Sequence, residues 1–180
     1  MVCDEGPMRY LSVIIPCYNE QRNLERGVLA EVYQYLVDQT YGWEVIIVND
    51  ESTDDSRDLI RRFIQDKKGF KLLDIPHGGK PAAVWAGIQE AHAGVVLFTD
   101  MDQSTPLKEV EKLLPWYGRG YDVVIGSRGA ERQGFSIVRQ VGSDALPVVG
   151  AAGVHRRHRV QVQVLVPHAA ALDPDVMGAP

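Results

Sequence analysis

Apolar residues along the first 126 positions recur with two periods, which predict strands and helices in alternation. Short runs rich in β-branched residues, such as LSVIIP at 11–16 and VVLFT at 95–99, have the length and composition of buried strands. Between such runs, apolar residues lie three or four positions apart, which is the period of an amphipathic helix. The predicted strands cover residues 11–16, 43–48, 70–75, 95–99 and 122–126. The predicted helices cover residues 23–39, 54–63, 81–92 and 106–116, with Asn23 expected to cap the first.

Polar residues gather at the carboxyl ends of the predicted strands. A regular alternation of strands and helices is typical of an α/β domain with a mostly parallel sheet and helices on both faces. In such sheets, ligands bind outside the carboxyl ends of the strands. The polar clusters follow directly on the first four predicted strands, at residues 18–20, 49–51, 77–80 and 100–102. This coincidence predicts a binding site at that edge of the sheet.

Two carboxylates in the last of these clusters indicate a metal site. Asp100 and Asp102 follow an apolar strand that ends at Thr99. Carboxylates this close repel each other unless a cation lies between them or water screens them. A divalent cation such as Mg²⁺ or Mn²⁺ prefers oxygen ligands and often bridges to substrate phosphates. A solvated turn is the alternative, but the strand before it and the neighbouring clusters favour the metal.

A phosphate group would have to be neutralised by cations, because the glycine-rich phosphate motifs are missing. The sequence contains neither a P-loop nor a G-x-G-x-x-G after a strand, which argues against P-loop and dinucleotide-binding enzymes. Lys80, Arg128 and Arg139 are the candidate cations, although each is also compatible with a solvated surface residue.

Other polar positions have both functional and structural interpretations. Asp50 ends an apolar strand, where it could accept hydrogen bonds from a base or ribose, or cap a helix. Tyr18 could stack on a base or be a half-buried aromatic residue. Cys17, His77 and His92 are interpreted as structural, because no histidine pair has metal-binding spacing and no Ser/His/Asp arrangement is evident.

Charge and cysteine content point to a cytoplasmic protein. The net charge of −5 gives no reason to expect nucleic-acid binding, which usually needs a basic face. Two cysteines, Cys3 and Cys17, cannot build a disulfide framework and fit a reducing compartment. The N-terminal residues do not have the pattern of a signal peptide, and no apolar run is long enough to span a membrane. Any membrane contact, at the inner face, is therefore expected to be peripheral or to be carried by sequence absent here.

Five motifs in the predicted order resemble those of the family 2 inverting glycosyltransferases. They are VIIPCYNE at 13–20, VIIVNDESTDDS at 45–56, GK at 79–80, FTDMDQSTP at 98–106 and VVIGSR at 123–128. The match covers about 130 residues and looks most like the branch that transfers sugars to polyprenyl (dolichyl or undecaprenyl) phosphates. One departure is Pro81, which follows Lys80 where many relatives have glycine, so this loop is expected to be stiffer.

The resemblance implies a GT-A fold, which is Rossmann-like, and a nucleotide-sugar donor bound with Mg²⁺ or Mn²⁺. Asp100 and Asp102 would hold the ribose and the metal-bound diphosphate, with Asp102 the more direct metal ligand, and Lys80 matches a lysine near the donor. The expected nucleoside-binding residues are Pro16, Tyr18, Glu20 and Asp50, with Asn19 of the same motif as a further donor-binding candidate.

The resemblance also implies a phosphate acceptor and names the catalytic candidates. Arg128 and Arg139 match arginines that contact the acceptor phosphate, and with Asp102 they are the expected catalytic residues. A phosphate monoester is largely ionised at neutral pH, so it needs positioning more than it needs a general base. The expected reaction is inverting transfer from UDP-glucose, or secondly GDP-mannose. The alternatives are transfer to a saccharide hydroxyl, or an inactive truncated remnant.

The amino-acid composition of the sequence changes near residue 142. From residue 144 to 180 it contains no Lys, Glu, Ile, Ser, Thr, Asn, Cys or aromatic residue. We therefore expect a short extension at 1–10, a nucleotide-sugar-binding domain at 11–142, and an aberrant tail at 143–180 that is disordered or frame-shifted. A shifted reading of the codons for residues 157–163 is compatible with Asp-Thr-x-Cys-Arg-Phe-Lys, close to the motif with which the family continues.

Overall fold

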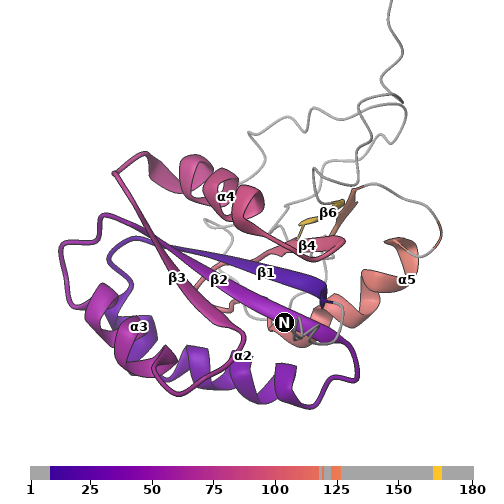
Figure 1. Ribbon diagram of the computed structural model, residues 1–180, viewed down its shortest axis with the longest axis horizontal. Helices are drawn as coiled ribbons and strands as arrows, with labels where there is room; N and C mark the ends of the chain where they lie inside the picture. The colour runs from indigo at the N-terminus through magenta and orange to yellow at the C-terminus, as the bar shows by residue number, and fades with distance from the viewer. Residues whose placement is uncertain (1–8, 118, 120–122, 127–163, 168–180) are drawn as a thin grey trace, which may run out of the picture.

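A computed structural model describes residues 9–117, 119, 123–126 and 164–167, which form one six-stranded sheet with helices on both faces (Figure 1). The strands are β1 (Arg9–Cys17), β2 (Gly42–Asp50), β3 (Phe70–Ile75), β4 (Val95–Phe98), β5 (Val124–Ile125) and β6 (Val164–Pro167). The helices are α1 (Gln21–Glu25), α2 (Val28–Val37), α3 (Ser56–Ile64), α4 (Gly79–Glu90) and α5 (Leu114–Tyr117), with a 3₁₀ helix, η1 (Leu107–Lys112).

The strand order is β3-β2-β1-β4-β6-β5, and it confirms the predicted mostly parallel sheet. The first four strands in this order are parallel, whereas β6 runs antiparallel to both β4 and β5. The chain moves outward from β1 to β3 and then returns to place β4 on the other side of β1. Such a reversal opens a crevice at the carboxyl ends of the two strands that flank it, here β1 and β4.

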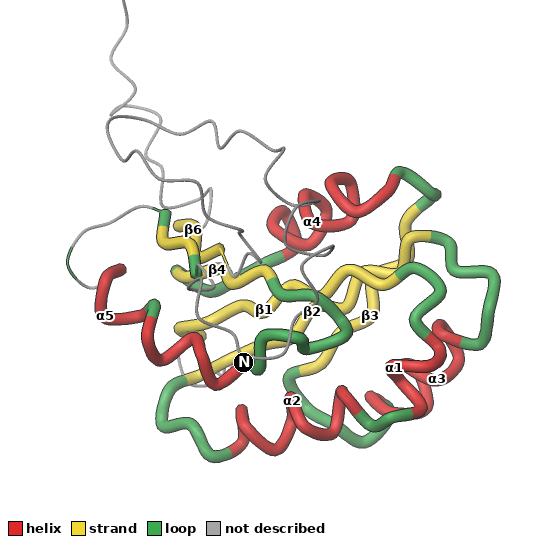
Figure 2. The backbone as a smooth tube through the Cα atoms, turned by 180° about the vertical axis from the view of Figure 1, so that it is seen from behind, coloured by secondary structure: helices red, strands yellow, loops and turns green. Residues whose placement is uncertain are grey.

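Alternate residues of β1 face two separate layers of helices. Val13 and Ile15 belong to an apolar cluster shared with α2, α3 and η1, while Ile14 packs in a second cluster with α4. Viewed from either side, α4 lies across one face of the sheet and α2 and α3 lie across the other (Figures 1 and 2). Burial on both faces explains why the central strands are near-continuous apolar runs. No described helix is long and apolar enough to cross a membrane.

The predicted helix at 23–39 is wrong as a single element, and Asn23 does not cap it. Gly27 adopts a left-handed conformation with φ of 84°, which interrupts the helix and separates α1 from α2. The N-cap residues are Glu20 for α1 and Gly27 for α2, and the Asn23 side chain instead donates a hydrogen bond to Glu20 Oε2 at 2.5 Å. Because of this break, the segment after β1 consists of a short helix, α1, followed by the longer helix α2.

The predicted helix at 106–116 is also divided, into η1 and α5. Its buried apolar residues Leu107, Val110 and Leu113 lie three positions apart. A 3₁₀ helix has three residues per turn, so this spacing places Leu107 and Val110 on one side of η1, and Leu113 follows directly after its end. Helix α4 begins at Gly79, two residues before the predicted start, with Pro81 in its first turn as expected.

Two regions of the predicted organisation fall largely outside the described residues. Of the extension at 1–10, the structure describes only residues 9 and 10, which belong to β1. Of the tail at 143–180, it describes only Val164–Pro167, which forms β6 between β4 and β5.

Replacing Gly87 with alanine should destabilise the fold through the contact of α4 with the sheet. A Cβ at this position would collide with Ile14 Cγ2 and lie 3.1 Å from Val48 Cγ2. Overpacking of this kind costs about 1–3 kcal/mol, partly offset by the gain in helix propensity of about 0.5–1 kcal/mol. Gly94 has open space around its Cα, so Gly94→Ala serves as the matched control. Urea unfolding measures both variants, and equal midpoints for the two would contradict the expected clash.

Candidate functional site

A cleft of about 280 Å³ lies at the carboxyl ends of β1 and β4, where the strand order reverses. It brings together residues from the end of β1 and the segment that follows it, the end of β2, helix α4 and the loop after β4. Its lining consists of Pro16, Cys17, Tyr18, Glu20, Asn23, Asp50, Lys80, Ala83, Asp100, Met101 and Asp102. Of the sequence-predicted site residues, all lie here except Asn19, Arg128 and Arg139. Arg128 and Arg139 fall outside the described residues.

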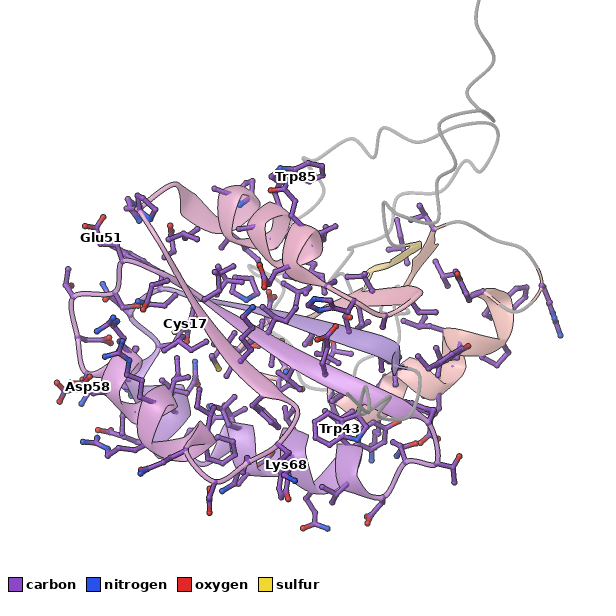
Figure 3. All side chains as sticks on the ribbon, in the orientation of Figure 1. Cys17, Trp43, Glu51, Asp58, Lys68 and Trp85 are labelled. Carbon is purple, nitrogen blue, oxygen red and sulfur yellow. The ribbon has the colours of Figure 1, made fainter. Side chains whose placement is uncertain are left out.

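A second hollow of about 400 Å³ lies on the other side of Lys80, along α4. Its remaining lining is apolar and includes Trp85, which points outward from the helix (Figure 3) and is 59% exposed. Although it is larger, this hollow offers a polar ligand only the Lys80 ammonium group. The smaller polar cleft is therefore the candidate site.

Asn19 holds the edge of the cleft without lining it. Its backbone has a φ of 54°, and its side-chain Oδ1 accepts a hydrogen bond from the Thr53 backbone N–H at 2.8 Å. Its own N–H donates to Ser52 Oγ at 3.1 Å. These contacts tie the loop after β1 to the loop after β2, and so fix the positions of Tyr18 and Glu20 on either side.

Three strand-end loops contain a residue with a left-handed backbone. They are Asn19 after β1, Glu51 after β2 and Gln103 after β4, and they are the non-glycine residues with positive φ in the described part of the chain. Such conformations are uncommon outside glycine and cluster where a binding site requires a sharp turn. Their placement at a single edge of the sheet supports the assignment of that edge as the functional one.

Asp50 anchors the start of α4. Its carboxylate is 2% exposed and accepts hydrogen bonds from the backbone N–H groups of Gly78, at 2.7 Å, and Gly79, at 2.9 Å. His77 Nδ1 lies 3.1 Å from the same carboxylate. A negative charge at a helix N-terminus is favourable because the first N–H groups of a helix lack partners within the helix. Asp50 thus joins β2 to α4 beneath the cleft, in addition to its predicted role toward the donor.

Lys80 and Asp100 form an ion pair across the cleft. Lys80 Nζ lies 2.5 Å from Asp100 Oδ1 and 5.1 Å from the centre of the Phe98 ring. The pair places the positive charge in the cleft that Asp102 also lines. Lys80 can therefore neutralise either the Asp100 carboxylate or a phosphate oxygen.

Asp102, the residue predicted to be the more direct metal ligand, lies in the turn after β4. It is exposed, and one carboxylate oxygen, Oδ1, accepts a hydrogen bond from the Ser104 backbone N–H at 2.9 Å. The same contact orients the other oxygen. Within the described residues, no group of three or more His, Cys, Asp or Glu side chains is arranged to hold a metal ion. Asp100 and Asp102 suit Mg²⁺ or Mn²⁺ as oxygen ligands, provided that substrate phosphates and water complete the coordination, as is usual for Mg²⁺.

Cys17 lines the cleft but does not supply a nucleophile. Burial raises the pKa of its thiol to about 11, although hydrogen bonds with Ser52 and Ser56 act in the opposite direction. A raised pKa favours the protonated form, and the reactive form of cysteine is the thiolate. At neutral pH this thiol is therefore a small apolar contact in the wall of the cleft.

The mostly parallel sheet with its polar cleft matches the GT-A fold of solved glycosyltransferases, and comparison with known proteins identifies the family of the chain. Residues 12–173 match the family model for glycosyl transferase family 2. The chain belongs to this family, which confirms the resemblance seen in the sequence.

Individual relatives and solved structures are similar to this chain over part of their own length. A dolichyl-phosphate beta-glucosyltransferase from Trichomonas vaginalis is 33% identical over 137 residues, which cover 69% of this chain and 41% of the relative. The chain thus spans less than half of that protein. The structure of TarS residues 1–349 from S. aureus superposes with a TM-score of 0.55 over 93% of this chain and 49% of TarS, at 20% identity, and supports the fold.

A third similar protein was solved with its ligands. Glucosyl-3-phosphoglycerate synthase from Mycobacterium tuberculosis, in complex with Mn²⁺, UDP and glucosyl-3-phosphoglycerate, is 25% identical to this chain. Its TM-score is 0.50, over 64% of this chain and 42% of the synthase.

Proposed function

We propose that this chain is the donor-binding part of an inverting transferase that moves a sugar from a nucleoside diphosphate to a polyprenyl phosphate, with Mg²⁺ or Mn²⁺. The observation that supports the proposal best is the convergence of Tyr18, Asp50, Lys80, Asp100 and Asp102 on one cleft at the β1–β4 crevice. UDP-glucose is the first candidate donor and GDP-mannose the second. The named activity of the Trichomonas relative supports both a polyprenyl phosphate acceptor and a glucosyl donor.

The roles of the donor-binding residues follow from their positions in the cleft. Tyr18 presents a half-exposed ring for stacking on the base, with Pro16 and Glu20 beside it. Asp102 and Asp100 would hold the divalent cation, which when bound stabilises the charge that develops on the departing nucleoside diphosphate. Lys80, in the first turn of α4, is paired with Asp100 and would add a positive charge near the same phosphates.

The acceptor is positioned rather than activated in this proposal. A phosphate monoester at neutral pH is already largely an anion, and arginine pairs bind such groups with charge-assisted hydrogen bonds. We assign this role to Arg128 and Arg139. Attack from the face opposite the leaving diphosphate inverts the anomeric carbon. Because the proposed acceptor is a membrane lipid, we place the reaction at the cytoplasmic face of a membrane, with peripheral contact.

Transfer to a hydroxyl group is the second candidate function. It is favoured by the similarity to glucosyl-3-phosphoglycerate synthase, whose structure contains a glucosylated small acid. A hydroxyl acceptor needs a general base. The carboxylates that line the described part of the cleft are those of Glu20, Asp50, Asp100 and Asp102, all assigned above to the donor or the metal, so this reaction would use a base elsewhere in the chain.

A transfer assay with radiolabelled UDP-glucose and GDP-mannose separates these functions. Polyprenyl phosphate, 3-phosphoglycerate and a disaccharide serve as acceptors, with Mn²⁺, Mg²⁺ or EDTA. The proposal expects metal-dependent transfer to the lipid phosphate. Transfer only to a hydroxyl acceptor would establish the alternative, and absence of both transfer and donor binding would identify an inactive remnant.

Replacing Arg128 or Arg139 with alanine should weaken acceptor use more than donor binding. Each lost charge-assisted contact is worth about 1.5–3 kcal/mol, which corresponds to a decrease of about 10- to 150-fold in kcat/KM for the lipid phosphate. The affinity for UDP, measured by calorimetry, should change less than about threefold. An equal decrease in UDP affinity would instead place these arginines on the donor diphosphate.

A further inference from the structure

Asn23 lines the cleft, although it was expected only to cap a helix. Its side chain lies between two charged groups. Nδ2 donates a hydrogen bond to Glu20 Oε2 at 2.5 Å, and Oδ1 accepts one from Arg26 Nη1 at 3.0 Å. An ionised carboxylate can only accept and a guanidinium can only donate, so these two partners fix the orientation of the amide. Asn23 therefore connects a carboxylate of the cleft to an exposed cation at the end of α1.

The backbone of Glu20 is held on both sides. Its N–H donates to Ser56 Oγ at 2.8 Å, and Ser56 is fully buried. Its carbonyl oxygen accepts hydrogen bonds from the backbone N–H groups of Asn23, at 3.0 Å, and Leu24, at 3.1 Å. The remaining freedom of Glu20 is that of its side chain, and the Asn23 amide restricts it. A group fixed before the ligand arrives loses less entropy on binding.

One oxygen of the Glu20 carboxylate remains available to a ligand. Oε2 accepts the hydrogen bond from Asn23, whereas Oε1 has no hydrogen-bond partner among the residues that the structure describes. Glu20 is partly buried and lines the same cleft as Asp100 and Asp102. A carboxylate with one oxygen held and the other open can accept a hydrogen bond from a hydroxyl or N–H group, which a nucleoside carries on its ribose or base.

We propose that Asn23 is a positioning residue for nucleotide binding, which orients the Glu20 carboxylate and is itself held by Arg26. The inference rests on the proposed function and adds to it a residue outside the motifs. A neutral amide suits this position because it donates to Glu20 without bringing a second negative charge into the cleft. Alanine would leave the Glu20 carboxylate free to rotate, and aspartate would repel it.

A double-mutant cycle in the affinity for UDP tests whether Asn23 acts through Glu20. Calorimetric titration with UDP in the presence of Mn²⁺ compares the parent, Asn23→Ala, Glu20→Ala and the double variant. Asn23→Ala should lower the affinity by about tenfold, the size of one hydrogen bond to a charged group. In the Glu20→Ala background, the same replacement should change the affinity by less than about twofold, because the carboxylate that Asn23 orients is gone. A merely structural effect would be equal in both backgrounds.

Glu25→Ala is the matched control. Glu25 Oε1 accepts a hydrogen bond from Gln21 Nε2 at 2.8 Å on the same helix as Asn23, but neither of these two residues lines the cleft. Loss of this bond should leave the affinity for UDP within about twofold of the parent. Urea unfolding of every variant measures whether the fold is kept.

Asn23→Asp keeps the size of the side chain and adds a readout that depends on pH. At about pH 7.5 it places a second negative charge against Glu20, so UDP should bind more weakly than to the parent. Toward about pH 5 one of the two carboxyl groups takes up a proton and can donate to the other. The affinity of this variant relative to the parent should therefore rise by about fivefold as the pH falls. A relative affinity that does not change with pH would contradict the contact between the two side chains.

The outcomes separate this inference from the proposed function. A parent chain that does not bind UDP would overturn both. If the parent binds UDP and Glu20→Ala binds it equally well, or if the effect of Asn23→Ala is the same with and without Glu20, positioning by Asn23 is wrong and nucleotide binding stands. A loss in Asn23→Ala that disappears in the Glu20→Ala background, with unfolding midpoints near that of the parent, supports the inference. Should Asn23→Ala fold poorly, the pH dependence of Asn23→Asp decides the matter.

Discussion

Replacing Asp102 with asparagine is expected to abolish metal-dependent binding of UDP-glucose while the fold stays intact. Asparagine retains an Oδ1 atom that can accept the hydrogen bond from the Ser104 backbone N–H, so the turn after β4 keeps its conformation. It loses the negative charge and one oxygen suited to a hard cation. We expect the affinity for UDP in the presence of Mn²⁺ to fall by at least about 100-fold, since even outer-shell partners of a metal change its affinity by 10- to 100-fold.

Asp100→Asn is the matched comparison for this experiment. Asp100 is paired with Lys80, so its removal releases a positive charge that can move to the diphosphate and compensate in part. The loss should therefore be smaller than for Asp102→Asn. An Asp102→Asn variant that binds UDP as tightly as the parent, with and without EDTA, would exclude Asp102 as a metal ligand.

Replacing Asp50 with alanine should cause one of the largest losses of stability of any polar substitution in the described domain. The change removes two hydrogen bonds to the start of α4 and leaves the N–H groups of Gly78 and Gly79 without their carboxylate. Buried groups left unsatisfied in this way cost about 1–3 kcal/mol, and hydrogen bonds to a charged group are at the high end. We expect a decrease of about 2–4 kcal/mol in the free energy of unfolding, measured by urea denaturation.

Asp66→Ala provides the control for Asp50→Ala. Asp66 is paired only with its neighbour Lys67 and is 79% exposed, so its removal should leave the unfolding midpoint close to that of the parent. If Asp50→Ala were no less stable than Asp66→Ala, the link between β2 and α4 would not depend on this carboxylate.

The fold was predictable where local sequence decides it. Strand β3 has the predicted bounds, 70–75, because an apolar run is ended there by proline and glycine. The break at Gly27 was missed because an isolated glycine in a helical pattern is often tolerated, and its left-handed backbone becomes visible only in three dimensions. The pairing of strand β6 with β4 was not predictable, since it joins residues about 70 positions apart and no local pattern encodes such a contact.

The composition of the candidate site was predictable from topology, and its contacts were not. Parallel strands end at one edge, so polar residues after β1, β2 and β4 had to meet there. The role of Asp50 at the start of α4 depends on where the β3–α4 loop folds back, which the sequence does not specify. The polar cluster at 77–80 follows β3 at the same edge, and of its residues the structure places Lys80 in the lining of the cleft.

The position of β6 within the sheet has a consequence for synthesis on the ribosome. Strands β1 to β4 emerge in order and can pair as soon as they leave the exit tunnel, whereas the partner that the structure gives to the outer side of β4 is residues 164–167. At about 5–20 residues per second, several seconds separate the appearance of these two strands. During that interval the nascent chain presents Val95–Phe98, an apolar strand, with one side unpaired. Such an edge is a template for association with other chains, so the yield of folded protein should depend on chaperones that bind extended apolar segments during translation.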